Sequence, residues 1–320
     1  MATFWLFSAH RMRAALPALA PSVVLAALLL GIGVFEPSFL SAYSLRVLMG
    51  ESSPILLLAV AQTTVIMLGG IDLSVAAVTS LASVLLALIL PGFGVWGLAL
   101  VLLLTTAIGA LQGYIHVIAQ LPSFVVTLAG MGLWAGIALS IAQTTIPVTR
   151  GYSVVGWMQG SLLGIPTSFV FAAGVALLIW LALRQSALGR YVQAIGLGET
   201  AALFSGVRVD RVKIATFALS GLLAGATGAA LVARTYSGNP SAANSLLLPS
   251  IAAVVVGGTA ITGGFGGIGR TIIGVLIISV LRVGIAIVGI DPGYEPLAYG
   301  LVVICAVALT MDRTRIAVVK

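Results

Sequence analysis

Long apolar runs, interrupted by very few charges, constrain this chain more than any other feature. Of its 320 residues, 60% are hydrophobic and only 7% are charged. Soluble domains carry about 25% charged residues, so this composition excludes an ordinary soluble domain. Only helices and closed barrels satisfy their backbone within lipid, and barrel strands alternate polar and apolar residues over short segments. The continuous runs therefore predict an all-α polytopic membrane protein.

The lengths of the runs predict about ten transmembrane helices, because a helix needs about 20 apolar residues to cross a bilayer. Some of them are expected to be broken or short, and the segment 246–262 is short enough to be partly re-entrant. We expect one transmembrane domain over residues 1–320, with helices at residues 17–35, 47–69, 73–91, 95–118, 124–143, 166–184, 212–234, 246–262, 270–290 and 295–311.

Basic residues predict how the chain is oriented. Lysine and arginine collect in cytoplasmic loops, which explains the net charge of +7 better than nucleic-acid binding does. The basic groups before the first span, between spans six and seven, and after the last span all face the cytoplasm if both termini do. Arg46 and Arg150 fit less well, since both fall in loops that this arrangement places outside. The cytoplasmic set is Arg11, Arg13, Arg184, Arg190, Arg208, Arg211, Lys213, Arg313, Arg315 and Lys320.

One acid lies in the middle of apolar sequence. Asp72 follows Gly69 and Gly70, and a charge at bilayer depth costs about 2.5–3.5 kcal/mol on insertion scales. The two glycines are expected to break a helix, and Asp72 or Ser74 suits the cap of the next one. We interpret this segment as part of a translocation path or gate. Asp72 either caps a helix without touching solute, contacts the solute directly, or carries a proton.

Other polar residues within the predicted spans have two interpretations each. Gln62, Thr63 and Thr64 form a polar step that lines a hydrophilic path or bonds to its own helix backbone. Arg234 snorkels from a helix end, whereas Arg282 in mid-span is expected to face the bundle interior or a dimer partner.

The only sizeable hydrophilic segment is 185–211. Residues 199–205 are expected to form two helical turns, with Gly198 before them and Gly206 at the position just past the end, where glycine is favoured. A plain connector needs no helix, glycine stops and mixed charge, so we interpret the segment as a cytoplasmic docking element.

No motif for covalent chemistry or metal binding stands out. The chain has one cysteine, Cys305, and two histidines, which disfavours a multi-cysteine or histidine metal site. A G-x-x-x-x-G-K-S/T phosphate loop is absent, so the chain is not expected to hydrolyse ATP by that route. The G-x-G-x-x-G pattern from Gly264 to Gly269 precedes a membrane-length apolar stretch rather than a βαβ unit. We expect no catalytic residue, no metal and no cofactor on this chain.

Several motifs, in order, resemble the permease subunits of bacterial ABC sugar importers of the ribose, xylose and galactoside branch. The resemblance covers about residues 45–312. The motifs are Leu68-Gly69-Gly70-Ile71-Asp72-Leu73-Ser74-Val75, Pro122-Ser123-Phe124-Val125-Val126-Thr127-Leu128, Leu188-Gly189-Arg190-Tyr191, Glu199-Thr200-Ala201-Ala202-Leu203-Phe204-Ser205-Gly206, and Ala252-Ala253-Val254-Val255-Val256-Gly257-Gly258-Thr259 followed by Gly263-Gly264-Phe265-Gly266. Two departures from the family pattern are Ala76 and Arg270, where glycine is usual.

The resemblance implies the fold of type II ABC importer permeases and a place in the bacterial inner membrane. It implies a dimer with a second permease copy or paralogue, a cytoplasmic ATPase that holds ATP and Mg, and an extracytoplasmic sugar-binding protein. The coupling loop to the ATPase would be 185–211, through Gly189, Arg190, Glu199, Ala201, Ala202 and Gly206. The translocation path or gate would include Gln62, Thr63, Gly69, Gly70, Asp72, Ser74, Gly257, Gly258 and Thr259.

The expected function is thus the membrane subunit of an ATP-driven importer of a pentose or hexose. Two alternatives stay open: a permease for branched-chain amino acids or nucleosides, and a proton-coupled secondary transporter in which Asp72 carries the proton.

Overall fold

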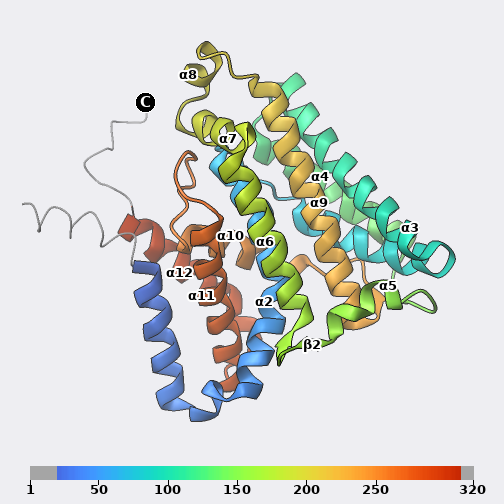
Figure 1. The fold of residues 1–320 in the computed structure, drawn as a ribbon, viewed down its shortest axis with the longest axis vertical. Coiled ribbons are helices and arrows are strands. Elements are labelled where there is room, and N and C mark those ends of the chain that lie inside the picture. The colour runs from blue at the N-terminus through green and yellow to red at the C-terminus, as the bar shows by residue number, and fades with distance from the viewer. Residues whose placement is uncertain (1–19, 311–320) are drawn as a thin grey trace, which may run out of the picture.

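The computed structural model describes residues 20–310, which form a bundle of helices (Figure 1). Within that part of the chain, six helices are long and apolar enough to cross a membrane. They are α2 (Ala42–Met67), α3 (Val75–Ile118), α4 (Ser123–Ile141), α6 (Thr167–Gln185), α9 (Val209–Thr235) and α11 (Ile268–Ile287). Shorter apolar helices are Ala20–Phe35, α10 (Leu247–Val256) and α12 (Glu295–Thr310).

The expected number of about ten spans is not confirmed by this count. The two spans expected at 73–91 and 95–118 form one element, α3, whose helical backbone is interrupted at Gly94 (φ 51, ψ −127). In Figure 1, α3 turns back on itself at its right-hand end. The span expected at 246–262 is a helix of only ten residues, because the chain leaves helical geometry at Gly258, which has φ +93. Residues 17–19 and 311 lie outside the described part.

The centre of the bundle is built around α2, α3 and α9. Three quarters of the way along α3, Gly109 lies against α9 so closely that a Cβ there would meet the carbonyl of Phe217. Gly221 of α9 is just as close to the carbonyl of Thr105, and Gly228 lies against Ala82. Small residues that let two backbones touch are the usual device for packing membrane helices. Both halves of α3 therefore pack closely against α9 at these glycines.

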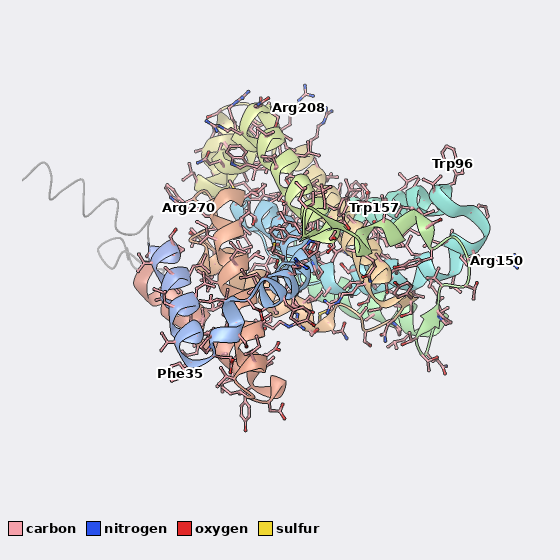
Figure 2. The ribbon with its side chains drawn as sticks, turned by 60° about the horizontal axis from the view of Figure 1, so that its bottom comes forward. Phe35, Trp96, Arg150, Trp157, Arg208 and Arg270 are labelled. Carbon is pink, nitrogen blue, oxygen red and sulfur yellow. The ribbon has the colours of Figure 1, made fainter. Side chains whose placement is uncertain are left out.

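The two ends of the bundle differ. At one end lie α7 (Ala187–Leu197) and α8 (Glu199–Phe204), at the top of Figure 1. Figure 2 shows Arg208 at this end, whereas Trp96 and Arg150 lie at the lobe that α3 and α4 form.

Short elements connect the helices. These are 3-10 helix η1 (Pro37–Leu40), α5 (Ser153–Gly156), 3-10 helix η2 (Trp157–Gln159), 3-10 helix η3 (Asn244–Leu246) and 3-10 helix η4 (Pro292–Tyr294). Strand β1 (Ile146–Pro147) pairs antiparallel with β4 (Ser237–Gly238), and β2 (Ser161–Leu162) with β3 (Ile165–Pro166).

Candidate functional site

The double glycine ends α2, as the sequence predicts. Gly69 has φ +88, a conformation that favours glycine, and residues 69–74 run without helical structure until α3 begins at Val75. Asp72 lies in this break and is buried, with 3% of its surface exposed. The break therefore places an acid inside the bundle between two long helices.

Hydroxyl and amide groups surround the Asp72 carboxylate. Its Oδ1 accepts hydrogen bonds from the Ser74 amide at 2.9 Å and from Ser74 Oγ at 2.6 Å. Its Oδ2 accepts one from Ser220 Oγ of α9 at 2.7 Å. Ser74 is the N-cap residue of α3, so Asp72 orders the turn just before the helix, and its bond to Ser220 ties that turn to α9.

The bonds around Ser74 decide how Gln112 is oriented. Ser74 Oγ lies 2.6 Å from Asp72 Oδ1 and 2.7 Å from the Gln112 side-chain amide, but a hydroxyl has one proton. The Gln112 atom that faces Ser74 is Oε1, and the Gln112 nitrogen has no partner among the described residues. Exchanging the amide oxygen and nitrogen lets Gln112 donate to Ser74 while Ser74 donates to Asp72. A chain of hydrogen bonds then leads from Gln112 of α3 through Ser74 to the Asp72 carboxylate.

The first turn of α4 satisfies the backbone of the break. Ser123 Oγ accepts the amide proton of Ile71 at 3.1 Å, and Thr127 Oγ1 accepts that of Leu73 at 3.1 Å. Two sequence motifs that lie about 50 residues apart are therefore one structural unit.

The polar step of α2 is buried rather than open. Gln62 Nε2 donates to the Asp72 carbonyl at 2.6 Å, which joins Gln62 to the break. Thr63 Oγ1 bonds to the Ala59 carbonyl and meets Thr271 Oγ1 of α11 at 2.6 Å. Thr64 bonds to the Ala61 carbonyl. We name Gln62, Asp72, Ser74, Gln112 and Ser220 the Asp72 cluster. Thr63 instead belongs to the contact between α2 and α11.

Three backbone segments meet beside the break at glycines. The Gly264 amide donates to the Met67 carbonyl at 2.9 Å. A Cβ on Gly196 of α7 would collide with that same carbonyl and with the Gly264 amide, and one on Gly263 would lie 2.8 Å from the Gly69 nitrogen. The end of α2, the loop after α10 and the end of α7 are therefore held in backbone contact.

The residues Gly257, Gly258 and Thr259 lie away from Asp72. A Cβ on Gly257 would meet the Arg270 backbone, and Arg270 donates to the Gly258 carbonyl at 3.3 Å. Thr259 Oγ1 accepts the Gly267 amide at 3.3 Å. This group shapes the turn between α10 and α11 and does not join the Asp72 cluster.

The hydrophilic segment contains the short helix that the sequence predicts. After α8 ends, Gly206 with φ +82 donates to the Leu203 carbonyl and Val207 donates to that of Ala202, a helix-ending motif that glycine favours. Ala202 faces inward and is 4% exposed, so of the alanine pair only Ala201 is available to a partner. Instead, Leu203 and Phe204 project, with 58% and 86% of their surface exposed.

The remaining residues of this segment hold it together. Glu199 pairs with Lys213 of α9 at 2.7 Å. A Cβ on Gly189 would collide with the Leu183 carbonyl, so glycine lets α7 fold tightly against the end of α6. Arg190 is exposed.

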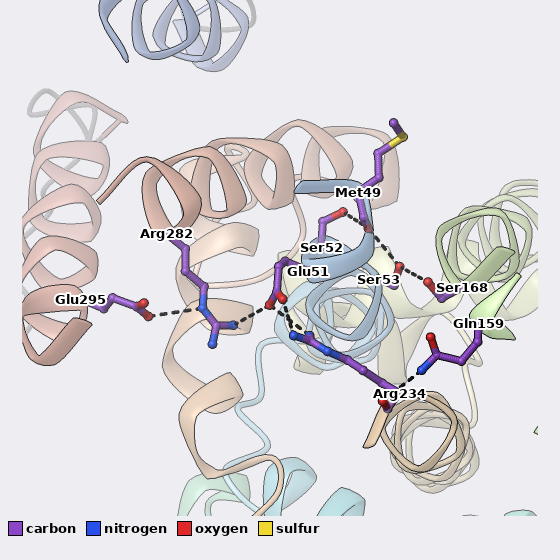
Figure 3. A network of polar contacts seen from close by, with 9 residues as sticks. All are labelled: Met49, Glu51, Ser52, Ser53, Gln159, Ser168, Arg234, Arg282 and Glu295. Atoms are coloured by element: carbon purple, nitrogen blue, oxygen red, sulfur yellow. Dashed lines mark hydrogen bonds and ion pairs between the residues drawn. The ribbon is translucent and has the colours of Figure 1, made fainter. Parts of the chain in front are cut away.

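Figure 3 shows a second polar cluster, which joins α2 to the last turn of α9. Glu51 of α2 pairs with Arg234 of α9 through both carboxylate oxygens, and Arg282 of α11 lies 4.0 Å from Glu51. The Arg282 Nε is 3.4 Å from Glu295 of α12, which accepts from Tyr299 at 2.9 Å. We name Glu51, Arg234, Arg282 and Glu295 the outer ion network.

The outer ion network was only partly foreseen. Arg282 does face the bundle interior, as expected, and Arg234 does lie at a helix end. Glu51 was missed, although an acid inside the span expected at 47–69 is the same signal that singles out Asp72. Ser220 and Gln112 have no sequence signal, because single hydroxyl and amide residues are common in helices.

An aromatic pair supports the chain beside Arg234. Tyr152 stacks on Tyr236 with ring centroids 4.3 Å apart, and the Tyr152 hydroxyl donates to the Ala233 carbonyl. Burial and the neighbouring Tyr236 hydroxyl raise the pKa of Tyr152 to about 12. Tyr152 therefore stays a neutral donor at physiological pH.

Side chains that could bind a metal are not clustered in the described part of the chain. Across residues 20–310, no three His, Cys, Asp or Glu side chains gather as metal ligands. The arrangement offers buried hydrogen bonds, flexible glycine turns and ion pairs between helices, which suit a protein that changes conformation.

Comparison with known proteins decides the family. The family model described as "Branched-chain amino acid transport system / permease component" matches residues 45–310. The chain belongs to this permease family. This permease is therefore a multi-pass membrane protein and a transport component rather than an enzyme.

Its relatives carry sugar names. The permease is 35% identical over 302 residues to the ribose import permease protein RbsC of Bacillus subtilis (strain 168), which covers 92% of this chain and 93% of that protein. It is 35% identical over 293 residues to RbsC of Escherichia coli (strain K12), a match that covers 89% of this chain and 91% of that protein. The fructose import permease protein FrcC of Rhizobium meliloti is 35% identical over 312 residues, covering 92% and 85%.

Proposed function

We propose that this chain is the membrane-spanning subunit of an ATP-driven importer that passes a monosaccharide, a pentose or hexose, into the cytoplasm. The observation that carries the proposal is the likeness, over nearly the whole chain, to import permeases for ribose and fructose. The chain would work in the bacterial inner membrane, beside a second permease copy or paralogue, and receive solute from an extracytoplasmic binding protein.

Ten membrane crossings are part of this proposal. Among residues 20–310, the six long helices give seven crossing segments because Gly94 divides α3, and the three shorter apolar helices bring the sum to ten. An even number places both termini on the cytoplasmic side, together with the basic segment 185–211.

The segment 185–211 would couple the permease to a cytoplasmic ATPase that binds ATP and Mg. Support comes from the exposed Leu203 and Phe204 on α8, since an aromatic side chain that fills a pocket on the partner can anchor an interface. The glycine contact of Gly196 with the end of α2 gives the segment a direct path to the Asp72 break.

Phe204→Ala tests the coupling assignment. Because Phe204 is 86% exposed, its removal should leave the fold intact while association with the ATPase weakens by about tenfold or more. The measurement is co-purification and affinity of the co-expressed ATPase. Phe35→Ala, which removes a phenylalanine that is 85% exposed and lies away from Arg208 in Figure 2, is the matched control. Unchanged ATPase affinity in Phe204→Ala contradicts the assignment.

Branched-chain amino acids are the second candidate solute, because the family description names them. ATP-dependent uptake into proteoliposomes that contain the permease, its ATPase and its binding protein decides between them. Uptake of D-ribose or D-fructose supports the monosaccharide proposal, whereas uptake of leucine without either sugar overturns it. Uptake that needs a proton gradient and no ATP would favour a secondary transporter.

A further inference from the structure

Two cavities meet at Glu51, at the end of the bundle away from α7 and α8. One has a volume of about 520 Å³ and the other about 570 Å³, and Tyr43, Val47 and Glu51 line both. Each volume is within the range of roughly 300–1,000 Å³ that small-molecule sites occupy. We name the two together the Glu51 vestibule.

The walls of the vestibule combine apolar surface with directed polar groups. Val47, Pro54, Met158 and Ala230 supply apolar contact in the first cavity. Donors and acceptors come from five different elements, so a ligand there would touch several helices at once. They are Arg46, Glu51 and Ser53 of α2, Gln159 of η2, Ser161 of β2, Ser168 of α6 and Arg234 of α9.

The charges in the vestibule disfavour a cationic ligand. Three arginines and two glutamates line it, and both glutamates are already engaged in the outer ion network. A free ammonium group would find no unpaired carboxylate there, which disfavours a zwitterionic amino acid. Hydroxyl groups, in contrast, both donate and accept, so they can share the remaining donor sites of the guanidinium groups and the lone pairs of the carboxylates.

The polar groups are held in place before any ligand arrives. Arg234 grips both oxygens of Glu51, and the Gln159 amide donates to the Ala233 and Arg234 carbonyls at 2.8 and 2.9 Å. Ser53 Oγ donates to the Met49 carbonyl at 3.0 Å and lies 3.2 Å from Ser168 Oγ (Figure 3). Fixed side chains lose little entropy on binding, which favours recognition of a small solute.

The vestibule is also joined to the Asp72 break. Glu51 precedes Gln62 by eleven residues on α2, a rise of about 16 Å, and Gln62 bonds to the Asp72 backbone. Arg234 and Ser220 occupy the same helix, α9, and Ser220 bonds to the Asp72 carboxylate. The two helices that hold Glu51 therefore also hold Asp72.

We propose that the Glu51 vestibule is the site at which this permease receives its solute, and that Glu51 and Arg234 recognise a monosaccharide through hydrogen bonds to its hydroxyl groups. This inference rests on the proposed function. It goes beyond it by assigning the sugar contacts to particular residues of the membrane subunit.

Uptake by the complete importer is the first test. In proteoliposomes, Glu51→Gln should lower the ATP-dependent uptake of D-ribose or D-fructose by about tenfold or more, because a hydrogen bond to a charged group is lost and the Arg234 guanidinium is left unpaired. Asp291→Asn is the matched control, since Asp291 is exposed, lies close to Glu295 in sequence and lines neither cavity. It should stay within about twofold of wild type.

The outcomes separate this inference from the function on which it rests. If the wild-type importer takes up a sugar and Glu51→Gln does so at a rate within twofold, the vestibule is not the solute site although the function stands. If the wild type takes up neither sugar, the proposed function itself fails.

Thiol protection decides the case in which Glu51→Gln does not assemble. In a Cys305→Ser background, Val47→Cys places the single thiol at a position that lines both cavities. With the whole importer in nanodiscs, saturating D-ribose or D-fructose should slow maleimide labelling at least threefold, whereas Asp291→Cys should be unaffected. Equal labelling with and without sugar overturns the proposal. A thiol at Val47→Cys that does not label and instead cross-links to a second copy of the chain also overturns it, because the vestibule would then be a dimer interface.

Discussion

Replacing Ser220 with alanine removes the one hydrogen-bond donor that, within residues 20–310, reaches Oδ2 of the buried Asp72. In the described part of the chain, Asp72 Oδ2 accepts from Ser220 Oγ at 2.7 Å, whereas both bonds to Oδ1 come from Ser74. Asp72 is 3% exposed, so bulk water cannot take the place of the hydroxyl. Leaving a buried charged acceptor without its partner costs about 2–3 kcal/mol, and we expect Ser220→Ala to lose that much free energy of unfolding.

Ser279→Ala is the matched control for this prediction. Ser279 lies in a transmembrane helix, α11, is fully buried, and its hydroxyl has no partner among residues 20–310. Its removal deletes an unsatisfied group, so the variant should be as stable as wild type or slightly more stable. Because both changes convert serine to alanine within a helix, the difference between them cancels the effect of helix propensity.

The measurement is reversible unfolding of the purified permease in mixed detergent micelles, followed by circular dichroism. The expected result is a gap of about 2–3 kcal/mol between the two variants. Free energies of unfolding that agree within about 0.5 kcal/mol would refute the view that Ser220 stabilises Asp72.

Two further predictions concern glycines at close backbone contacts. Gly109→Ala should lower the thermal stability of the permease, because the new Cβ meets the Phe217 carbonyl. In an exposed helix the same change would instead stabilise the helix by about 1 kcal/mol. Gly132→Ala in α4 is the control and should not lower the stability, since its Cβ meets nothing within 4 Å. Gly196→Ala should reduce ATP-driven uptake by about tenfold while the ATPase still co-purifies, because it separates α7 from Met67 and Gly264. Gly174→Ala in α6, where the Cβ has open space, is its control, and equal uptake by the two variants would contradict the coupling path.

Local signals predict much of this fold. Continuous apolar runs place the long helices to within a few residues. Gly69, Gly70 and Asp72 locate the break, because glycine destabilises a helix and an acid at bilayer depth costs insertion free energy. Gly206 is found in the same way, since its φ of +82 is a local requirement.

Long-range partners escape sequence reasoning. The division at Gly94 between the spans expected at 73–91 and 95–118 is such a local signal, but the partners of those spans are not. Ser220 and Gln112 matter because they lie beside Asp72, and that proximity depends on the packing of α3 against α9. Ala202 shows the same limit: the family resemblance implies that it contacts the ATPase, but it is buried within its own segment.

The glycine contacts between α3 and α9 have a mechanical consequence. Where backbone touches backbone, as at Gly109 and Gly221, no flexible side chain remains to change rotamer and let one helix slide along the other. We therefore expect α3 and α9 to move as one rigid body. A movement that opens the solute path first to one side of the membrane and then to the other should therefore occur at helix contacts formed by side chains. One such contact joins α2 to α11, where Thr63 and Thr271 share one hydrogen bond.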